Sequence, residues 1–289
     1  MRPIKVGALT IKKVVEKDQG LYNPFEFFLG ASKEGVESQK EWLHPHFLSK
    51  DGHMRMSIHS YLVETKHHNI LVDTCIGLHG SPEQQARNRI DETTFLKNLK
   101  DAGVEPADID FVLCTHLHFD HTGWNTRLEN GRFVPTFANA KYLFSRPEFE
   151  YWKDVESNAW NGFAIHECVN PVVEAGQAMI VEPNHVLEDG LYLEHMPGHT
   201  PGSVCLNLES KGEKAAMFGD MIHHPLQIGQ PDWTINADAD KGQAAETRKA
   251  FLERHADDNT LMMAAHFAGP TIGRISTVSG MWRLDVIEE

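Results

Sequence analysis

The sequence predicts an α+β fold in a single domain, in which strands dominate both halves and helices separate them. Short apolar runs recur along the whole chain, as is typical of buried strands. Helical end signals or an amphipathic pattern occur in three places between these runs. No linker, low-complexity tract or internal repeat divides the 289 residues, and one large domain can reach that length.

In the first half, the apolar runs predict strands, each of which is bounded by polar or turn-forming residues. The expected strands cover 4–15 (one or two strands), 57–64, 69–73, 111–115 and 140–144. An amphipathic helix is expected over 91–102, where Phe95 and Leu99 share one face and Gly103 ends it. Arg146 and Pro147 are typical of the first residues of another helix.

The second half repeats this pattern. Further strands are expected at 191–196, 203–208, 214–218 and 261–265. A helix is predicted over 241–255, directly before the last of these strands. The pattern of 160–183 is mixed and predicts no defined element.

Residues 20–56 fit neither periodicity. Their aromatic side chains lie among glycine, proline, serine and lysine, so the segment is too aromatic for a disordered linker. Long irregular segments in compact domains are usually functional or mobile. We interpret 20–56 as an irregular flap or packing arm of the domain 1–289, and we expect it to border the active site. A surface loop that a few aromatics anchor is an equally good interpretation.

The sequence Thr-His-Leu-His-Phe-Asp-His at 115–121 contains four potential metal ligands within six positions, His116, His118, Asp120 and His121. They follow the apolar run 111–115, so a strand delivers them to one edge of a sheet. The two histidines of a His-x-His pair cannot share a helical face, where neighbours are three or four residues apart. Imidazole and carboxylate ligands together suit zinc and similar divalent metals. The alternative, a solvated polar loop, explains four such residues poorly.

Three further ligand candidates stand where other apolar strands end. His199 follows 191–196, Asp220 follows 214–218, and His266 follows 261–265. Each of them alone is better explained as a structural residue. Together with the loop at 115–121 they make seven ligands, which exceeds the needs of one tetrahedral zinc with an open position. The set therefore suits two divalent metal ions, for which we expect Zn²⁺, sharing one carboxylate.

This ordered set resembles the metallo-β-lactamase superfamily, and the resemblance extends from about Ser57 to His266. It implies a four-layer αββα sandwich of two mixed β-sheets flanked by helices. It also implies that one metal is held by His116, His118 and His199, and the other by Asp120, His121 and His266, with Asp220 bridging. Asp73, at the end of an early strand, matches a family residue that orients ligands. The family often has glycine two residues later, where this chain has Cys75.

Within the superfamily the chain is most similar to N-acyl homoserine lactonases and to methyl parathion hydrolase. The resemblance implies hydrolysis of lactones or carboxylic esters by a metal-bridging hydroxide. Phosphotriester hydrolysis is the alternative, and a mononuclear iron dioxygenase or a thioesterase on this fold is a further one. Lactonases commonly have tyrosine three residues after the bridging aspartate, where this chain has His223.

Asp120 and His223 are the candidate catalytic residues. His223 could donate a proton or hydrogen bond to the substrate, although a packing role is equally compatible with the sequence. Trp124 is the aromatic residue that we expect to form an apolar wall of the substrate site.

Composition limits the partners. The formal charge of −14 argues against nucleic acid, because phosphate binding requires a basic surface. No run is long enough to span a membrane, and the first residues lack a signal-peptide pattern. Four scattered cysteines are typical of reduced thiols, so we expect a cytoplasmic enzyme that acts on a small molecule. A homodimer is compatible with the sequence.

Overall fold

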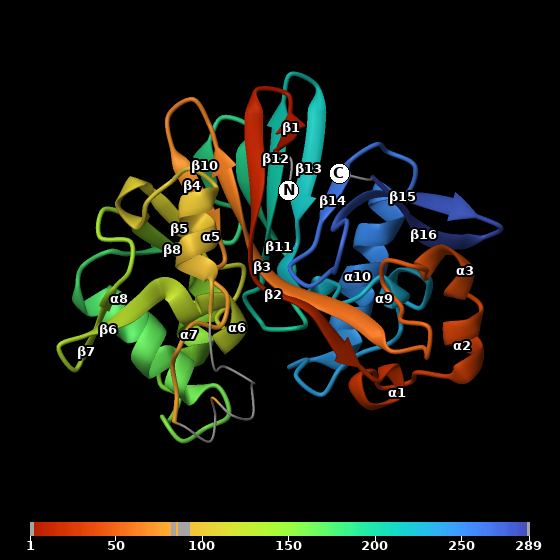
Figure 1. Ribbon diagram of the computed structural model, residues 1–289, viewed down its shortest axis with the longest axis horizontal. Helices are drawn as coiled ribbons and strands as arrows, with labels where there is room; N and C mark the ends of the chain where they lie inside the picture. Colours follow the sequence, from red (N-terminus) through yellow and green to blue (C-terminus); the bar gives the residue numbers. More distant parts are fainter. Residues whose placement is uncertain (1–2, 82–84, 86–92, 288–289) are drawn as a thin grey trace. The chain divides into compact units, whose positions relative to one another are not determined.

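The computed structural model describes residues 3–81, 85 and 93–287, and the chain divides into two compact units (Figure 1). Unit 1 consists of the described residues within Met1–Lys17 and Ile58–Pro183. Unit 2 consists of those within Asp18–Ser57 and Asn184–Glu289. Two long strands, β2 (Leu9–Tyr22) and β3 (Met54–Glu64), contribute residues to both units.

A seven-stranded mixed sheet has the order β1-β2-β3-β4-β5-β8-β9. Its remaining strands are β1 (Ile4–Val6), β4 (Asn69–Val72), β5 (Phe111–Leu113), β8 (Lys141–Ser145) and β9 (Ala178–Val181). Strands β4, β5, β8 and β9 run parallel, and Val72 pairs with Leu113 at the carboxyl ends. Because parallel strands end at the same edge, the residues that follow β4 and β5 meet there. The short strands β6 (Thr126–Glu129) and β7 (Arg132–Pro135) form a separate hairpin.

Helices complete unit 1. They include α5 (Phe95–Asp101), α6 (Phe119–Thr122), α7 (Arg146–Trp152), α8 (Asn170–Glu174), the 3₁₀ turns η1 (Pro106–Asp108) and η2 (Gly123–Asn125), and the π-helical η3 (Ala164–Val169). Phe95 and Leu99 of α5 are fully buried in the core of this unit, which confirms the predicted apolar face. The expected start of this helix at 91–92 lies outside the described residues.

The sheet of unit 2 has the order β10-β11-β12-β13-β14-β15-β16. Its strands are β10 (Val186–Glu188), β11 (Leu191–His195), β12 (Val204–Ser210), β13 (Glu213–Met217), β14 (Leu261–Met263), β15 (Ile272–Val278) and β16 (Met281–Val286). Strands β13 and β14 are parallel, with Met217 opposite Met263. The chain beyond each of them, which contains Asp220 and His266, therefore starts at the same edge of the sheet.

The helix predicted over 241–255 is confirmed, because α10 spans Lys241–His255. The side chain of Asp240 caps it by accepting a hydrogen bond from the amide of Gln243, which satisfies one of the free N–H groups at the helix start. Two short elements precede it, η4 (Gly219–Met221) and α9 (Leu226–Gly229).

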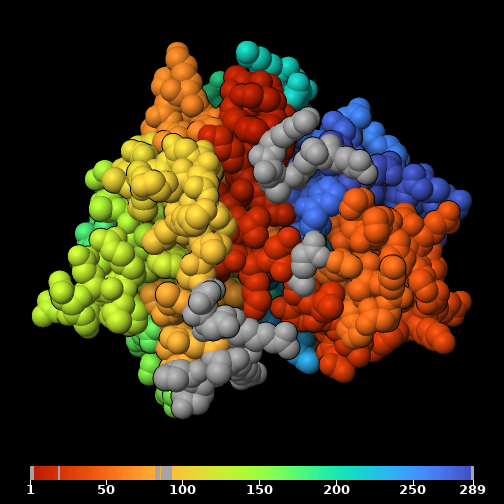
Figure 2. Space-filling model, in the orientation of Figure 1, coloured from red at the N-terminus to blue at the C-terminus, as the bar shows by residue number. Residues whose placement is uncertain are grey.

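The segment 20–56 is less irregular than predicted. It contains three short helices, α1 (Pro24–Phe27), α2 (Lys33–Glu37) and α3 (Lys40–Leu43). Figure 2 shows this segment on the surface of unit 2, yet Phe28 and Phe47 are buried in the core of that unit. Phe25 and Leu21, in contrast, are half exposed. The segment therefore combines packing residues with exposed apolar side chains.

No helix in the described part of the chain is long and apolar enough to cross a membrane. The four cysteines are buried and free of disulfides.

Candidate metal sites

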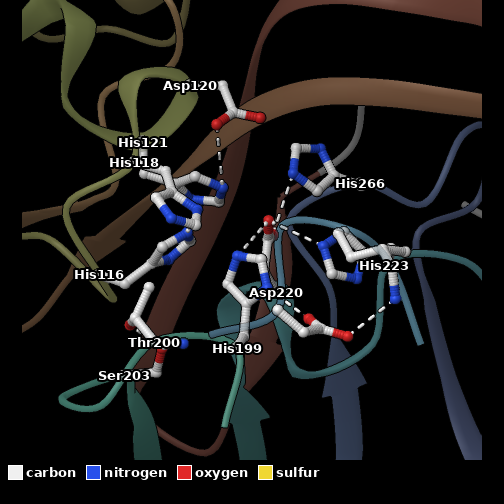
Figure 3. Close-up of polar contacts among 12 residues, drawn as sticks. His116, His118, Asp120, His121, His199, Thr200, Ser203, Asp220, His223 and His266 are labelled. Atoms are coloured by element: carbon white, nitrogen blue, oxygen red, sulfur yellow. Dashed lines mark hydrogen bonds and ion pairs between the residues drawn. The ribbon is translucent and has the colours of Figure 1, made fainter. Parts of the chain in front are cut away.

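In unit 1, the ligand loop 115–121 follows β5, and its last residues belong to α6. His116, His118 and His121 are buried, whereas the carboxylate of Asp120 is partly exposed. Nε2 of His116 lies 3.1 Å from Nδ1 of His118 (Figure 3). Two nitrogens bound to one tetrahedral zinc at about 2.1 Å would lie about 3.4 Å apart. The pair is thus already close to the separation that one metal ion requires.

Asp73 holds this loop from the end of β4. Its carboxylate accepts hydrogen bonds from the backbone amide and hydroxyl of Thr115, at 2.7 and 2.9 Å, and lies 2.8 Å from Nδ1 of His121. This contact makes Nε2 of His121 the nitrogen that remains for a metal. The turn is left-handed at Asp73 (φ 60°) and again at Cys75 (φ 55°). This conformation is one that glycine adopts without strain, so the position of Cys75 would also suit glycine.

In unit 2, His199 is placed by the tight turn after β11. Gly198 has φ 133°, and a Cβ atom on it would lie 2.3 Å from the backbone nitrogen of Ala244 in α10. Only glycine therefore lets the turn approach the helix. Nδ1 of His199 lies 2.8 Å from Oδ1 of Asp238, whose other oxygen accepts a hydrogen bond from the amide of Ile235.

The buried carboxylate of Asp220 lies among three imidazoles (Figure 3). Its oxygens are 3.0 Å from Nε2 of His266, 3.2 Å from Nε2 of His223 and 3.5 Å from Nε2 of His199. Nδ1 of His266 contacts the carbonyl oxygen of Ser57 at 3.0 Å. His121, His199 and His266 thus each have an oxygen on Nδ1, which orients the ring and leaves Nε2 as the ligand atom.

His223 belongs to the same buried group of unit 2. Its ring makes an edge contact with His199 at 4.9 Å and stacks with His266 at 6.1 Å between centroids. Burial lowers the pKa of His223, while the charge of Asp220 opposes this shift. Phe27 of α1 contacts the same ring, with 5.9 Å between centroids.

Each unit thus brings its own predicted ligands together. Unit 1 unites His116, His118, Asp120 and His121, and unit 2 unites His199, Asp220 and His266 with His223 beside them. Sequence reasoning missed Asp238, because this residue follows no predicted strand. Although burial alone would raise its pKa, the hydrogen bond and charge of His199 hold the pKa of Asp238 below its ordinary value.

The prediction that Trp124 forms a substrate wall is wrong. Its indole donates a hydrogen bond to Glu16 at 2.7 Å and stacks on Phe95, so it packs against the core of unit 1. Two other tryptophans contact the ligand loop instead. Trp152 and Trp160 lie edge-on to His118, with 5.6 and 4.9 Å between ring centroids, and Trp160 is 49% exposed.

These donors fit divalent metal ions. The candidate ligand atoms are imidazole nitrogens and carboxylate oxygens, which suit zinc and related first-row metals. Oxygens behind three of the histidines are the usual support of metal-bound imidazole. Candidate metal-binding groups are therefore present in both units.

Comparison with known proteins agrees with this chemistry. A family model described as the metallo-beta-lactamase superfamily matches residues 54–266, which include all seven predicted ligands. An N-acyl homoserine lactonase of Bacillus sp. is 30% identical over 167 residues, covering 52% of this chain and 58% of the lactonase. A human acyl-coenzyme A thioesterase is 28% identical over 185 residues, covering 60% of each chain. The chain thus matches about three fifths of the length of these curated relatives.

Solved structures share the fold over the whole chain. A dizinc quorum-quenching lactonase, AidC, in complex with its product N-hexanoyl-L-homoserine, has a TM-score of 0.79 at 24% identity, covering 100% of this chain and 97% of that one. The hydrolase AbOPH of the beta-lactamase superfamily has a TM-score of 0.80 at 23% identity, covering 99% and 98%. The α+β fold with two mixed sheets is confirmed, and the chain belongs to the metallo-β-lactamase superfamily.

Proposed function

We propose that this protein is a binuclear, zinc-dependent hydrolase of lactones or carboxylic esters. The observation that carries the proposal is that each unit gathers candidate histidine and aspartate ligands, and that oxygens orient three of these imidazoles, His121, His199 and His266. Family membership and the lactonases among the relatives support this reaction class. The product-bound dizinc relative supports both the metal and the kind of substrate.

Under this proposal, His116, His118 and His199 would hold one metal, Asp120, His121 and His266 would hold the other, and both would share Asp220. When bound, such a pair supplies a nucleophilic hydroxide at neutral pH and polarises the scissile carbonyl. The chain's own contribution is to fix the ligands, since oxygens of Asp73, Asp238 and Ser57 keep His121, His199 and His266 each in one tautomer.

His223 is the residue that we propose to act on the substrate directly. Its ring lies beside Asp220, and a neutral imidazole there can donate a hydrogen bond to the oxygen that gains charge as the ester opens. The exposed indole of Trp160 beside His118 is suited to the apolar part of a substrate.

A direct test combines metal analysis with a substrate screen. Protein purified without chelator should contain close to two equivalents of zinc, and the zinc-loaded enzyme should hydrolyse lactones or aryl esters faster than thioesters and phosphotriesters. Chelation should remove the activity, and added zinc should restore it. A stoichiometry that stays at one equivalent after zinc is added back would contradict the binuclear site. Iron as the only tightly bound metal would favour an oxygenase.

Phosphotriester hydrolysis is a second candidate because of one residue. His223 occupies the position where lactonases commonly have tyrosine, and this departure removes one feature of the lactonase pattern. A preference for phosphotriesters in the same screen would select this candidate over the lactonase.

Phe27 should influence the binding of bulky substrates. Its ring contacts both His223 and Tyr22, so replacing Phe27 with alanine removes an apolar surface next to the proposed donor. Losing about 1.4 kcal/mol of apolar contact corresponds to tenfold weaker binding. We therefore expect Phe27→Ala to raise KM about tenfold for long-chain substrates, with less effect on short ones.

Phe25 provides the matched control for this measurement. It belongs to the same helix α1 but is 52% exposed. Phe25→Ala should leave KM unchanged, and both variants should keep their zinc. Equal effects of the two substitutions would mean that residues 20–56 do not border the substrate site in the proposed way.

A further inference from the structure

The ligand loop carries two of its candidate metal ligands, His116 and His118, on backbone that belongs to no strand or helix. Strand β5 ends at Leu113 and α6 begins at Phe119, so His116, Leu117 and His118 lie between these two elements and belong to neither. Buried backbone groups nevertheless need hydrogen bonds. Leu117, between the two histidines of the His-x-His pair, is 1% exposed. Its amide and carbonyl must therefore be satisfied by something other than neighbouring strands.

Side chains provide these bonds. The backbone N–H of Leu117 donates to Oε1 of Glu148 at 3.0 Å, and the carbonyl of Leu117 accepts from Nδ2 of Asn161 at 2.7 Å. Oδ1 of Asn161 also accepts the N–H of Phe119 at 3.0 Å. The carbonyl of Leu117 requires a donor and the N–H of Phe119 requires an acceptor. Together they fix the orientation of the Asn161 amide. Glu148 and Asn161 thus provide hydrogen bonds to the loop backbone that a neighbouring strand would otherwise provide.

Glu148 has a second contact with the same site. Its Oε1 accepts the indole N–H of Trp152 at 2.8 Å, and the ring of Trp152 lies edge-on to His118. Glu148 is 1% exposed and stands in the first turn of α7. One buried oxygen therefore fixes the peptide between His116 and His118 as well as the aromatic ring that packs against His118.

We propose that Glu148 is a positioning residue for the metal held by His116 and His118, and that Asn161 assists it. This inference rests on the proposed function, because it takes these histidines as ligands. Glu148 acts through geometry: the Leu117 amide and the Trp152 indole both donate to Oε1, so these two contacts require an acceptor oxygen at this position. A glutamine can present the same oxygen, whereas alanine cannot.

The experiment compares Glu148→Ala with Glu148→Gln in the full-length protein. Partners of metal ligands typically contribute 10- to 100-fold to metal affinity, so Glu148→Ala should raise the zinc dissociation constant about 10- to 100-fold in chelator competition. It should also shift the ligand-field spectrum of the cobalt-substituted protein and speed hydrogen exchange at the Leu117 amide. Glu148→Gln should stay close to wild type in all three measurements. Trp152→Phe removes the indole N–H but leaves the hydrogen bond from Leu117 to Glu148 intact. Its effect on zinc affinity should therefore be smaller than that of Glu148→Ala.

Val172→Ala is the control for general destabilisation, because Val172 is buried in the core of the same unit. It should lower the melting temperature without changing the cobalt spectrum. Wild-type zinc affinity in Glu148→Ala would overturn the positioning role, even if exchange at Leu117 became faster. An equal loss in Glu148→Gln would overturn the geometric explanation. Absence of metal binding by the wild-type protein would instead refute the proposed function, and the inference with it.

Discussion

Replacing Asp220 with alanine should remove more metal than replacing any other ligand. Its carboxylate lies within 3.5 Å of imidazole nitrogens of His199, His223 and His266, and we propose that both metals share it. A ligand contributes more than the 10- to 100-fold of residues that only support ligands. We therefore expect zinc to fall from about two equivalents to well below one, and turnover to fall by more than about 100-fold.

His266→Ala is the comparison that tests whether both metals share Asp220. It removes one terminal ligand next to the same carboxylate, so the other metal should remain bound and the zinc content should stay near one equivalent. Asp220→Asn keeps the shape of the side chain but not its charge, and it should resemble Asp220→Ala in metal content. Elemental analysis of all three variants decides the question. Two equivalents of zinc in Asp220→Ala would show that this residue bridges nothing.

The predicted ligands came from a feature that sequence records well, namely polar residues directly after apolar strands. Parallel pairing of β4 with β5 and of β13 with β14 brings the ends of those strands to one edge within each unit. The order in which strands pair cannot be read from the sequence of any single strand. The position of a residue at the end of a strand can be read in this way. The predicted limits of α10 also agree with the structure, in which the side chain of Asp240 caps the start of the helix.

Residues whose role depends on a long-range contact could not be predicted in this way. Asp238 meets His199 across 39 positions of sequence, and nothing local marks it. Trp124 looked suitable for a substrate wall because it follows the ligand loop, but Glu16 accepts its indole N–H and draws it toward the core. The helices of 20–56 were missed for another reason. Each has only four or five residues, too few for a helical period to be recognised.

Substitution of His223 tests whether this residue stabilises the negative charge that develops on the substrate oxygen. Its buried ring contacts Asp220 at 3.2 Å and is proposed as a hydrogen-bond donor rather than as a ligand. Removing one donor of this kind commonly costs about 10²- to 10³-fold in turnover. We expect His223→Ala to lower kcat at least tenfold while both zinc ions stay bound.

The conservative variant separates this role from packing. His223→Tyr should retain part of the activity, because a phenol can also donate to an oxyanion, and it should shift preference toward lactones. The readouts are kcat and KM on a lactone and an aryl ester, measured beside zinc content. Unchanged kcat in His223→Ala would make the residue a packing group. Loss of zinc in that variant would assign it to the metal sites, since a substitution that releases metal has removed or displaced a ligand.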